Sequence, residues 1–166
     1  GAFAGDIYID DFMFLATGVG YTYEPFTPQE KKAILTDAMD RWIKGMMEVT
    51  AKKVSAWDAV NESVSGADRN GDGYYELESG EWGSPDNFYW QDYLGSEDYV
   101  RLVVGKAREY YEEFGGNPAE LKLFINDYNL ESWWDDNKKL KSLIEWIKVW
   151  EADGQTKIDG IGTQMH

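Results

Sequence analysis

Three short stretches of this sequence place polar side chains directly after an apolar run typical of a buried strand. Within residues 54–63 the apolar run ends in Asn61 and Glu62, and residues 121–129 and 157–166 repeat the same pattern. The carboxyl ends of parallel strands lie at one edge of a sheet or barrel, and barrel enzymes carry their catalytic groups there. We therefore expect the three polar sets to form one site.

Glu62 is the candidate for acid–base chemistry. A carboxyl group at the end of a buried strand, among Trp57 and other aromatic residues, would have its charged form disfavoured and its pKa raised. A raised pKa suits a general acid near neutral pH. The alternative is an ordinary solvated glutamate at a junction between strand and loop, and the residues alone leave both interpretations open.

The other two polar sets contain groups that bind sugars or similar ligands. Four polar residues follow the second apolar run, namely Asn126, Asp127, Tyr128 and Asn129. A tyrosine ring can stack on a substrate ring while amides bind its hydroxyl groups, although asparagine and aspartate are equally common in plain turns. Gln164 and the single histidine, His166, end the third run, and a histidine at a chain end is more often a frayed terminus than a catalytic group.

Composition narrows the class of protein. The chain has 166 residues, 43% hydrophobic and 16% aromatic, which suits one globular domain. Its formal net charge of -15 disfavours nucleic acid and anionic membrane surfaces as partners. It has no cysteine, and no apolar run approaches the roughly 20 residues of a membrane span. It also begins without methionine or a signal-peptide pattern, which indicates a processed or cut N-terminus.

The sequence predicts three helices that alternate with three strands. Thr27, Pro28 and Glu30 form a capping pattern for a helix that runs to about residue 52. Its residues at helical spacing are predicted to pack in the core: Leu35, Met39, Trp42, Met46 and Val49. Ser96 is predicted to cap a second helix, which Gly115 and Gly116 end.

The third helix is predicted over about 137–150, with its inward residues at Leu140, Leu143, Ile144 and Ile147. Strands are predicted at 54–60, 121–125 and 158–162, with a long loop at 63–95. This alternation implies a parallel α/β sheet, and the apolar strands imply that both sheet faces are covered. An open sheet and part of a (β/α)8 TIM barrel both fit, although three strands cannot close a barrel.

The three motifs together resemble glycoside hydrolase family 10, the endo-1,4-β-xylanases. Residues 57–62 (WDAVNE) are similar to the WDVVNE signature of that family. LFINDYN and IDGIGTQMH resemble its next two strand motifs, in the same order. The resemblance covers residues 27–166 and implies the fourth, fifth and sixth strands of a (β/α)8 barrel.

The resemblance also implies roles for single residues. Glu62 matches the acid/base, and Asn61 matches the asparagine near the 2-hydroxyl of the reacting sugar. Gln164 and His166 match the pair that contacts this sugar and orients the nucleophile. The residues matching the leaving-group side are Asn126, Tyr128 and Asn129. The family's nucleophile, a second glutamate on the next strand, is missing, as are the early strands.

We therefore expect a fragment of a retaining xylanase that acts on xylan or xylo-oligosaccharide. A complementary polypeptide would carry the rest of the barrel, and the protein would be secreted, periplasmic or on the cell surface. Residues 6–14 (DIYIDDFMF) alternate as a strand and resemble the end of a carbohydrate-binding β-sandwich module. Some family members carry such a module inserted in the barrel, so we expect 1–15 to be its end, 16–26 a linker and 27–166 the partial barrel.

Two further features remain open. Asp68, Asn70 and Asp72 have the spacing of a calcium loop, but position twelve would be Ser79, and a solvated turn is the favoured interpretation. No cofactor is expected to be required. The rival function is a non-catalytic carbohydrate-binding protein that uses exposed aromatic side chains, namely Trp82, Trp90, Tyr128, Trp133 and Trp134; the blandest alternative is a remnant with no activity of its own.

Overall fold

The computed structural model describes residues 24–84 and 86–165. Its elements are α1 (Pro28–Thr50), β1 (Ala56–Asn61), α2 (Trp90–Leu94), α3 (Asp98–Glu113), β2 (Lys122–Tyr128), α4 (Lys138–Glu151) and β3 (Gly160–Gln164). The strands form one parallel sheet in the order β1-β2-β3, which confirms the predicted α/β alternation. The predicted module end at 1–15 and most of the linker lie outside the described residues.

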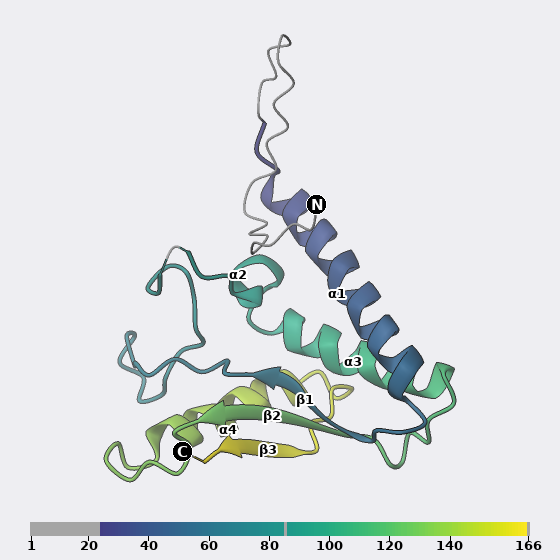
Figure 1. Ribbon diagram of the computed structural model, residues 1–166. Coiled ribbons are helices and arrows are strands. Elements are labelled where there is room, and N and C mark those ends of the chain that lie inside the picture. The colour runs from purple at the N-terminus through teal and green to yellow at the C-terminus, as the bar shows by residue number, and fades with distance from the viewer. Residues whose placement is uncertain (1–23, 85, 166) are drawn as a thin grey trace, which may run out of the picture.

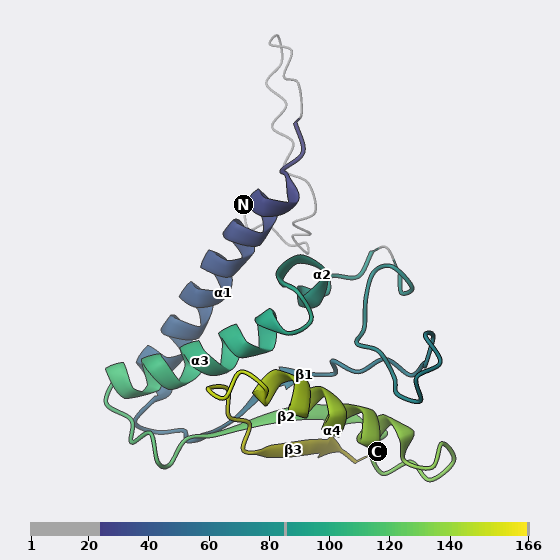
Figure 2. The ribbon, with the colours of Figure 1, turned by 180° about the vertical axis from the view of Figure 1, so that it is seen from behind.

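The helices and one face of β2 enclose a single apolar core. Figure 1 shows α1 and α3 crossing above the sheet, and α4 passes in front of the strands when the molecule is turned in Figure 2. Leu123, Ile125, Val100 and Leu143 are each fully buried in this core. Burial of such side chains supplies most of the drive to fold, at about 25 cal/mol for each Å² of apolar surface.

The opposite face of the sheet is more open. Along β2 the buried positions Leu123 and Ile125 alternate with Phe124 and Asn126, which are only partly buried. The expectation that both faces are covered is therefore wrong for the described residues. The reason is that successive side chains of a strand point to opposite faces, and here the helices pack against one of them.

The structure confirms one predicted helix cap and contradicts the other. Thr27 accepts a hydrogen bond from Glu30 N, and the Glu30 carboxylate accepts from Thr27 N, which is the predicted capping box. Ser96 caps nothing with its side chain. α3 begins at Asp98, and the Ser96 carbonyl oxygen instead accepts a hydrogen bond from Trp150 Nε1 at 2.9 Å.

The predicted buried face of α1 is displaced. Met39 is buried as expected, but its buried partners are Ile43 and Met47, spaced four residues apart. Trp42 is 71% exposed and Val49 is 64% exposed, so their assignment to the core is wrong. Apolar side chains surround this helix widely enough that spacing alone did not identify the face that meets α3.

A similar correction applies to α4. Leu143 and Trp150 are fully buried, whereas Ile144 is 39% exposed and does not belong to the inward face.

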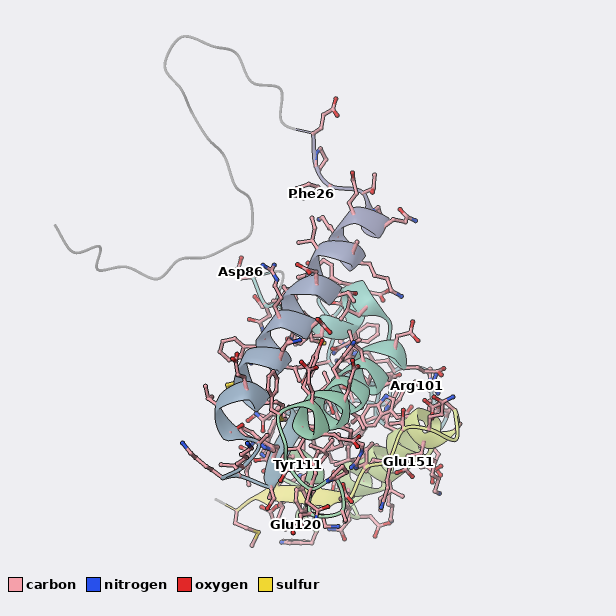
Figure 3. All side chains as sticks on the ribbon, turned by 90° about the vertical axis from the view of Figure 1, so that its right-hand side faces the viewer. Phe26, Asp86, Arg101, Tyr111, Glu120 and Glu151 are labelled. Carbon is pink, nitrogen blue, oxygen red and sulfur yellow. The ribbon has the colours of Figure 1, made fainter. Side chains whose placement is uncertain are left out.

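The guanidinium of Arg101 fixes the end of this helix to α3, because it donates to the carbonyl oxygens of Val149 and Trp150 at 2.7 and 3.1 Å. Figure 3 shows Arg101 beside this end of α4, near Glu151. The short helix α2, inside the predicted long loop, was not predicted.

Asp159 fixes the start of β3 beside β2. Its carboxylate accepts hydrogen bonds from Leu123 N at 3.0 Å and from Arg108 at 2.7 Å. Burial raises the pKa of Asp159, but the hydrogen bonds from Leu123 and Arg108 outweigh it, so that the pKa is lowered from its usual value. The ionised carboxylate is therefore the form that holds β3 in register.

Candidate active site

The carboxyl ends of β1, β2 and β3 lie at the same edge of the sheet. Figure 1 shows the three arrows pointing to the same side, toward the loops that follow β1 and β2. At this edge Asn61 Oδ1 accepts hydrogen bonds from Asn126 Nδ2 at 2.7 Å and from Gln164 Nε2 at 3.0 Å. One residue from each predicted polar set thus meets the other two.

A bulge in β1 brings Asn61 to this cluster. The register of β1 against β2 shifts between Asp58 and Val60, and Asn61 consequently pairs with Asn126. Without the shift Asn61 would pair with Asp127, whose side chain is on the buried face. A displacement of one residue turns every following side chain to the other face. The bulge therefore places Asn61 on the open face.

Glu62 follows β1 in a left-handed backbone conformation. Its φ is 54°, a conformation that costs a non-glycine residue about 1–2 kcal/mol. Its N–H still donates to the carbonyl of Asn126 at 2.8 Å, and its Oε1 accepts from Gln164 Nε2 at 2.9 Å. The side chain is exposed, so the expected burial among Trp57 and other aromatic residues is wrong for the described part of the chain.

The orientation of the Asn61 amide follows from this network. Its oxygen already accepts from Asn126 and from Gln164, while the described residues supply no acceptor for its Nδ2. Nδ2 is therefore available to donate to a ligand hydroxyl beside the Glu62 carboxylate. The arrangement combines a carboxyl group, which can transfer a proton, with an amide donor that can hold the reacting group.

Gly162 makes room for the Asn126 side chain. The two residues are paired between β3 and β2 and lie on the same face. A Cβ added at Gly162 would lie 2.7 Å from Asn126 Oδ1 and 3.2 Å from its Cβ, closer than side chains tolerate. The glycine in the third motif therefore has a steric role in the site that the residue pattern did not predict.

An ion pair lies beneath the open face. Asp127 is fully buried, and its Oδ1 is 2.7 Å from Nζ of Lys139, which is 3% exposed. The contact has the distance of an ion pair without the angle of a hydrogen bond. Lys139 Nζ also lies 3.3 Å from the centre of the Tyr128 ring. Sequence reasoning missed Lys139, although its position four residues before the inward Leu143 places it on the same face of the helix.

Asn129, a predicted site residue, is not joined to this cluster by its side chain in the described residues. Asn129 is half-buried in a left-handed conformation with φ of 59°, and its carbonyl accepts from Ser132 N, so it serves the turn after β2. No hydrogen bond joins its side chain to Glu62 or Gln164 in the described residues. His166 lies outside the described residues, and its role stays a prediction.

The loop with calcium-like spacing is closed by its own hydrogen bonds and by a lysine of α4. The Asp68 carboxylate accepts from Gly71 N and Gly73 N, and Lys138 Nζ lies 2.7 Å from its Oδ2. The hydrogen bond from Lys138 lowers the pKa of Asp68 most strongly. Asn70 Nδ2 donates to Asp72 Oδ2, and Asp72 N donates to Asn70 Oδ1. Nowhere in 24–84 or 86–165 do three or more acidic or histidine side chains converge as a metal site would require.

The aromatic residues of the rival interpretation differ in exposure. Trp133 and Trp134 are 83% and 67% exposed in the turn after β2, and Trp82 is 38% exposed with Arg69 over its ring. Trp90 is half-buried and packs against the core, so it is no free platform. The exposed pair therefore remains the best candidate for a sugar-stacking surface.

A hollow of about 570 Å³ lies away from Glu62, between α1, α3 and the sheet. Its lining is mainly apolar and includes Met39, Trp42, Trp57 and Val103. β1 is also an edge strand, because β2 is its single partner in the described sheet. An open strand edge beside an apolar hollow is a surface suited to further packing.

The chain is similar in sequence to known xylanases. Residues 22–166 match the family model described as Glycosyl hydrolase family 10. Endo-1,4-beta-xylanase A of Halalkalibacterium halodurans is 32% identical over 143 residues, which cover 86% of this chain and 29% of that protein. Endo-1,4-beta-xylanase A of Caldicellulosiruptor saccharolyticus is 30% identical, covering 83% and 33%.

Solved structures give the same picture. Xylanase B from Clostridium stercorarium F9 superposes with a TM-score of 0.61 at 27% identity, covering 86% of this chain and 35% of that one. The chain thus spans about a third of the length of each of these three proteins. Within the described residues, no helix is both long and apolar enough to cross a membrane.

Proposed function

The chain belongs to glycosyl hydrolase family 10, and from this membership we propose that it carries the acid/base half of a retaining endo-1,4-β-xylanase. Its substrate is xylan or xylo-oligosaccharide. The observation that carries the proposal is the pair of hydrogen bonds by which Gln164 Nε2 holds both Asn61 Oδ1 and Glu62 Oε1. This network presents an exposed carboxyl group and an amide donor side by side.

Glu62 acts first as the acid and then as the base. It gives its proton to the glycosidic oxygen as the bond to the leaving sugar breaks. A second carboxylate attacks the anomeric carbon and forms a covalent bond to it. Glu62 then removes a proton from water, which releases the sugar from that second carboxylate with retention. The chemistry needs no cofactor. The nucleophile must lie about 5–5.5 Å from Glu62, and it is supplied from outside this chain.

The neighbouring polar groups hold the substrate. Asn61 Nδ2 donates to the 2-hydroxyl of the sugar that reacts, where hydrogen bonds strengthen in the transition state. Gln164 orients Glu62, and with His166 it contacts the same sugar. The leaving-group side is bound by Asn126, Tyr128 and Asn129.

A complementary polypeptide completes the barrel. Three strands cannot close a (β/α)8 barrel, and the open edge of β1 together with the hollow beside Trp42 offers apolar surface for the preceding barrel elements. Trp42, exposed on α1, would be covered by that partner. On the same family basis, the protein is secreted, periplasmic or on the cell surface, and residues 1–15 are the end of an inserted carbohydrate-binding module.

The second candidate function is carbohydrate binding without turnover. The observation that favours it is the high exposure of Trp133 and Trp134 at the carboxyl edge of the sheet. Exposed indole rings are natural stacking surfaces for sugars. In that case the chain would bind xylan with or without Glu62.

The test measures the release of reducing sugar from soluble xylan by the assembled barrel, which is this chain together with the polypeptide that completes it. Glu62→Gln keeps the acceptor for Gln164 and removes the proton that is transferred, so we expect activity to fall at least about a hundredfold. Glu112→Gln, an exposed change on α3 far from the site, is the matched control and should keep full activity. Undiminished activity in Glu62→Gln would refute the assignment, whereas xylan binding without hydrolysis by the unmodified protein would favour the second candidate.

A further inference from the structure

The buried ion pair beneath the open face has no part in the chemistry proposed above. Lys139 and Asp127 are 3% and 0% exposed, and their charged atoms are 2.7 Å apart. Taking both charges out of water is costly, and apolar residues of similar size often stabilise a core as well or better. A role in arranging the site accounts better than stability for a pair at this position.

The ammonium group of Lys139 lies against the ring of Tyr128. Its Nζ is 3.3 Å from the ring centre, inside the range of a strong cation–π contact. The ammonium occupies one face of the ring, so a ligand can meet only the other face or the hydroxyl. The ring is therefore held in one orientation from below, in a place where water does not weaken the attraction.

The carboxylate of Asp127 joins this contact to the segment that carries Glu62. Its Oδ2 accepts a hydrogen bond at 3.1 Å from the N–H of Val64, two residues after Glu62. Its Oδ1 accepts from the N–H of Tyr128 at 2.9 Å. One carboxylate thus fixes the backbone of Tyr128 and the loop after β1, while Lys139 fixes the Tyr128 ring.

We propose that Lys139 is a positioning residue: held by Asp127, its ammonium fixes the Tyr128 ring and thereby determines how well the enzyme binds the sugar on the leaving-group side. The inference rests on the proposed function, in which Tyr128 contacts that sugar. Lys139 itself touches no substrate. Its loss should therefore affect substrates according to whether they place a sugar against Tyr128.

The experiment compares two substrates in the assembled barrel. Xylohexaose places sugars on both sides of the cleaved bond, whereas β-xylobiosyl fluoride has no ring on the leaving-group side. The variant is Lys139→Met with Asp127→Asn, which removes both buried charges and keeps an oxygen that can accept from Val64. We expect kcat/KM for xylohexaose to fall about tenfold or more, with the value for the fluoride changed less than about twofold.

The ratio of the two rates is the decisive readout, because both come from one preparation and any loss of folded protein cancels. An equal fall for both substrates would mean a purely structural role and would overturn the inference. The single change Lys139→Arg, which keeps a cation beside the unmodified Asp127, should retain part of the ratio. Unmodified protein inactive on both substrates would overturn the proposed function instead, and the positioning role with it.

A second comparison tests whether Lys139 acts through Tyr128. Tyr128→Ala alone should reproduce the selective loss on xylohexaose. Adding the paired change at Lys139 and Asp127 to Tyr128→Ala should then cause little further loss, because residues that act as a unit are not additive. Losses that multiply independently would show that Lys139 does not work through this ring.

Discussion

A single methyl group at Gly162 should misplace the amide network that orients Glu62. The Cβ of Gly162→Ala would lie 2.7 Å from Asn126 Oδ1, where ordinary contact begins at 3.4 Å. The β3 backbone is held against β2 by the sheet, so the Asn126 side chain is the part that must move. The hydrogen bond from Asn126 Nδ2 to Asn61 Oδ1, now 2.7 Å long, would be stretched or lost.

The size of the effect follows from that displacement. Restoring ordinary contact requires a shift of roughly 0.7 Å, and misplacing a catalytic group by about 1 Å can lower the rate about a hundredfold. Overpacking of this kind also costs about 1–3 kcal/mol of stability. We therefore expect kcat/KM on xylohexaose to fall about tenfold to a hundredfold, with a clear but smaller loss of thermal stability.

The assay measures kcat/KM and the unfolding midpoint in the assembled barrel for Gly162→Ala and for a matched change at Gly105. Gly105 lies in α3, where an added Cβ meets nothing within 4 Å. Its replacement by alanine should keep activity and stabilise the helix by about 0.5–1 kcal/mol. If Gly162→Ala hydrolyses xylohexaose at the unmodified rate, Asn126 does not depend on this glycine and the reasoning fails.

Two further predictions concern the frame that holds the strands. Leu143→Ala, at a fully buried position, should lower the free energy of unfolding by about 2–5 kcal/mol, whereas Ile144→Ala on the exposed side should cost less than about 1 kcal/mol; equal losses in urea unfolding would contradict the observed faces of α4. Asp159→Asn should reduce stability at neutral pH, because the lowered pKa of Asp159 makes its ionised form the stabilising one. That difference should be complete above the usual pKa of 3.8 and disappear as the pH falls through the lowered value, and a pH-independent difference would count against it.

Much of the frame followed from the sequence because the signals were local. The capping box at Thr27 and the alternation of helices and strands predicted the element order correctly, apart from the short helix α2. The meeting of Asn61, Asn126 and Gln164 was predictable because parallel strands share a carboxyl edge. The capping box was contained in one short stretch of sequence, whereas the meeting of the three residues followed from the order of the predicted elements.

The remaining features depend on contacts between distant segments. The bulge after Asp58 decides which face Asn61 takes, and it is visible only in the pairing of β1 with β2. The burial of Lys139 likewise requires the Asp127 carboxylate from another element, since a lysine in a helix is ordinarily solvated. Trp42 was assigned to the core because its spacing is helical, but spacing cannot say what lies opposite the helix.

The amide network orients the Asn61 amide and the Glu62 carboxylate through contacts within this chain. The oxygen of Asn61 is occupied by two amide donors, so this residue can offer a ligand only its Nδ2. Gln164 spans from β3 to Glu62 beyond β1, so the carboxyl group is oriented by a residue two strands away. The Glu62 carboxylate is nevertheless exposed. Under the proposed function, the barrel elements beyond the three described strands would have to supply a second carboxylate across from Glu62 and cover that excludes water from it.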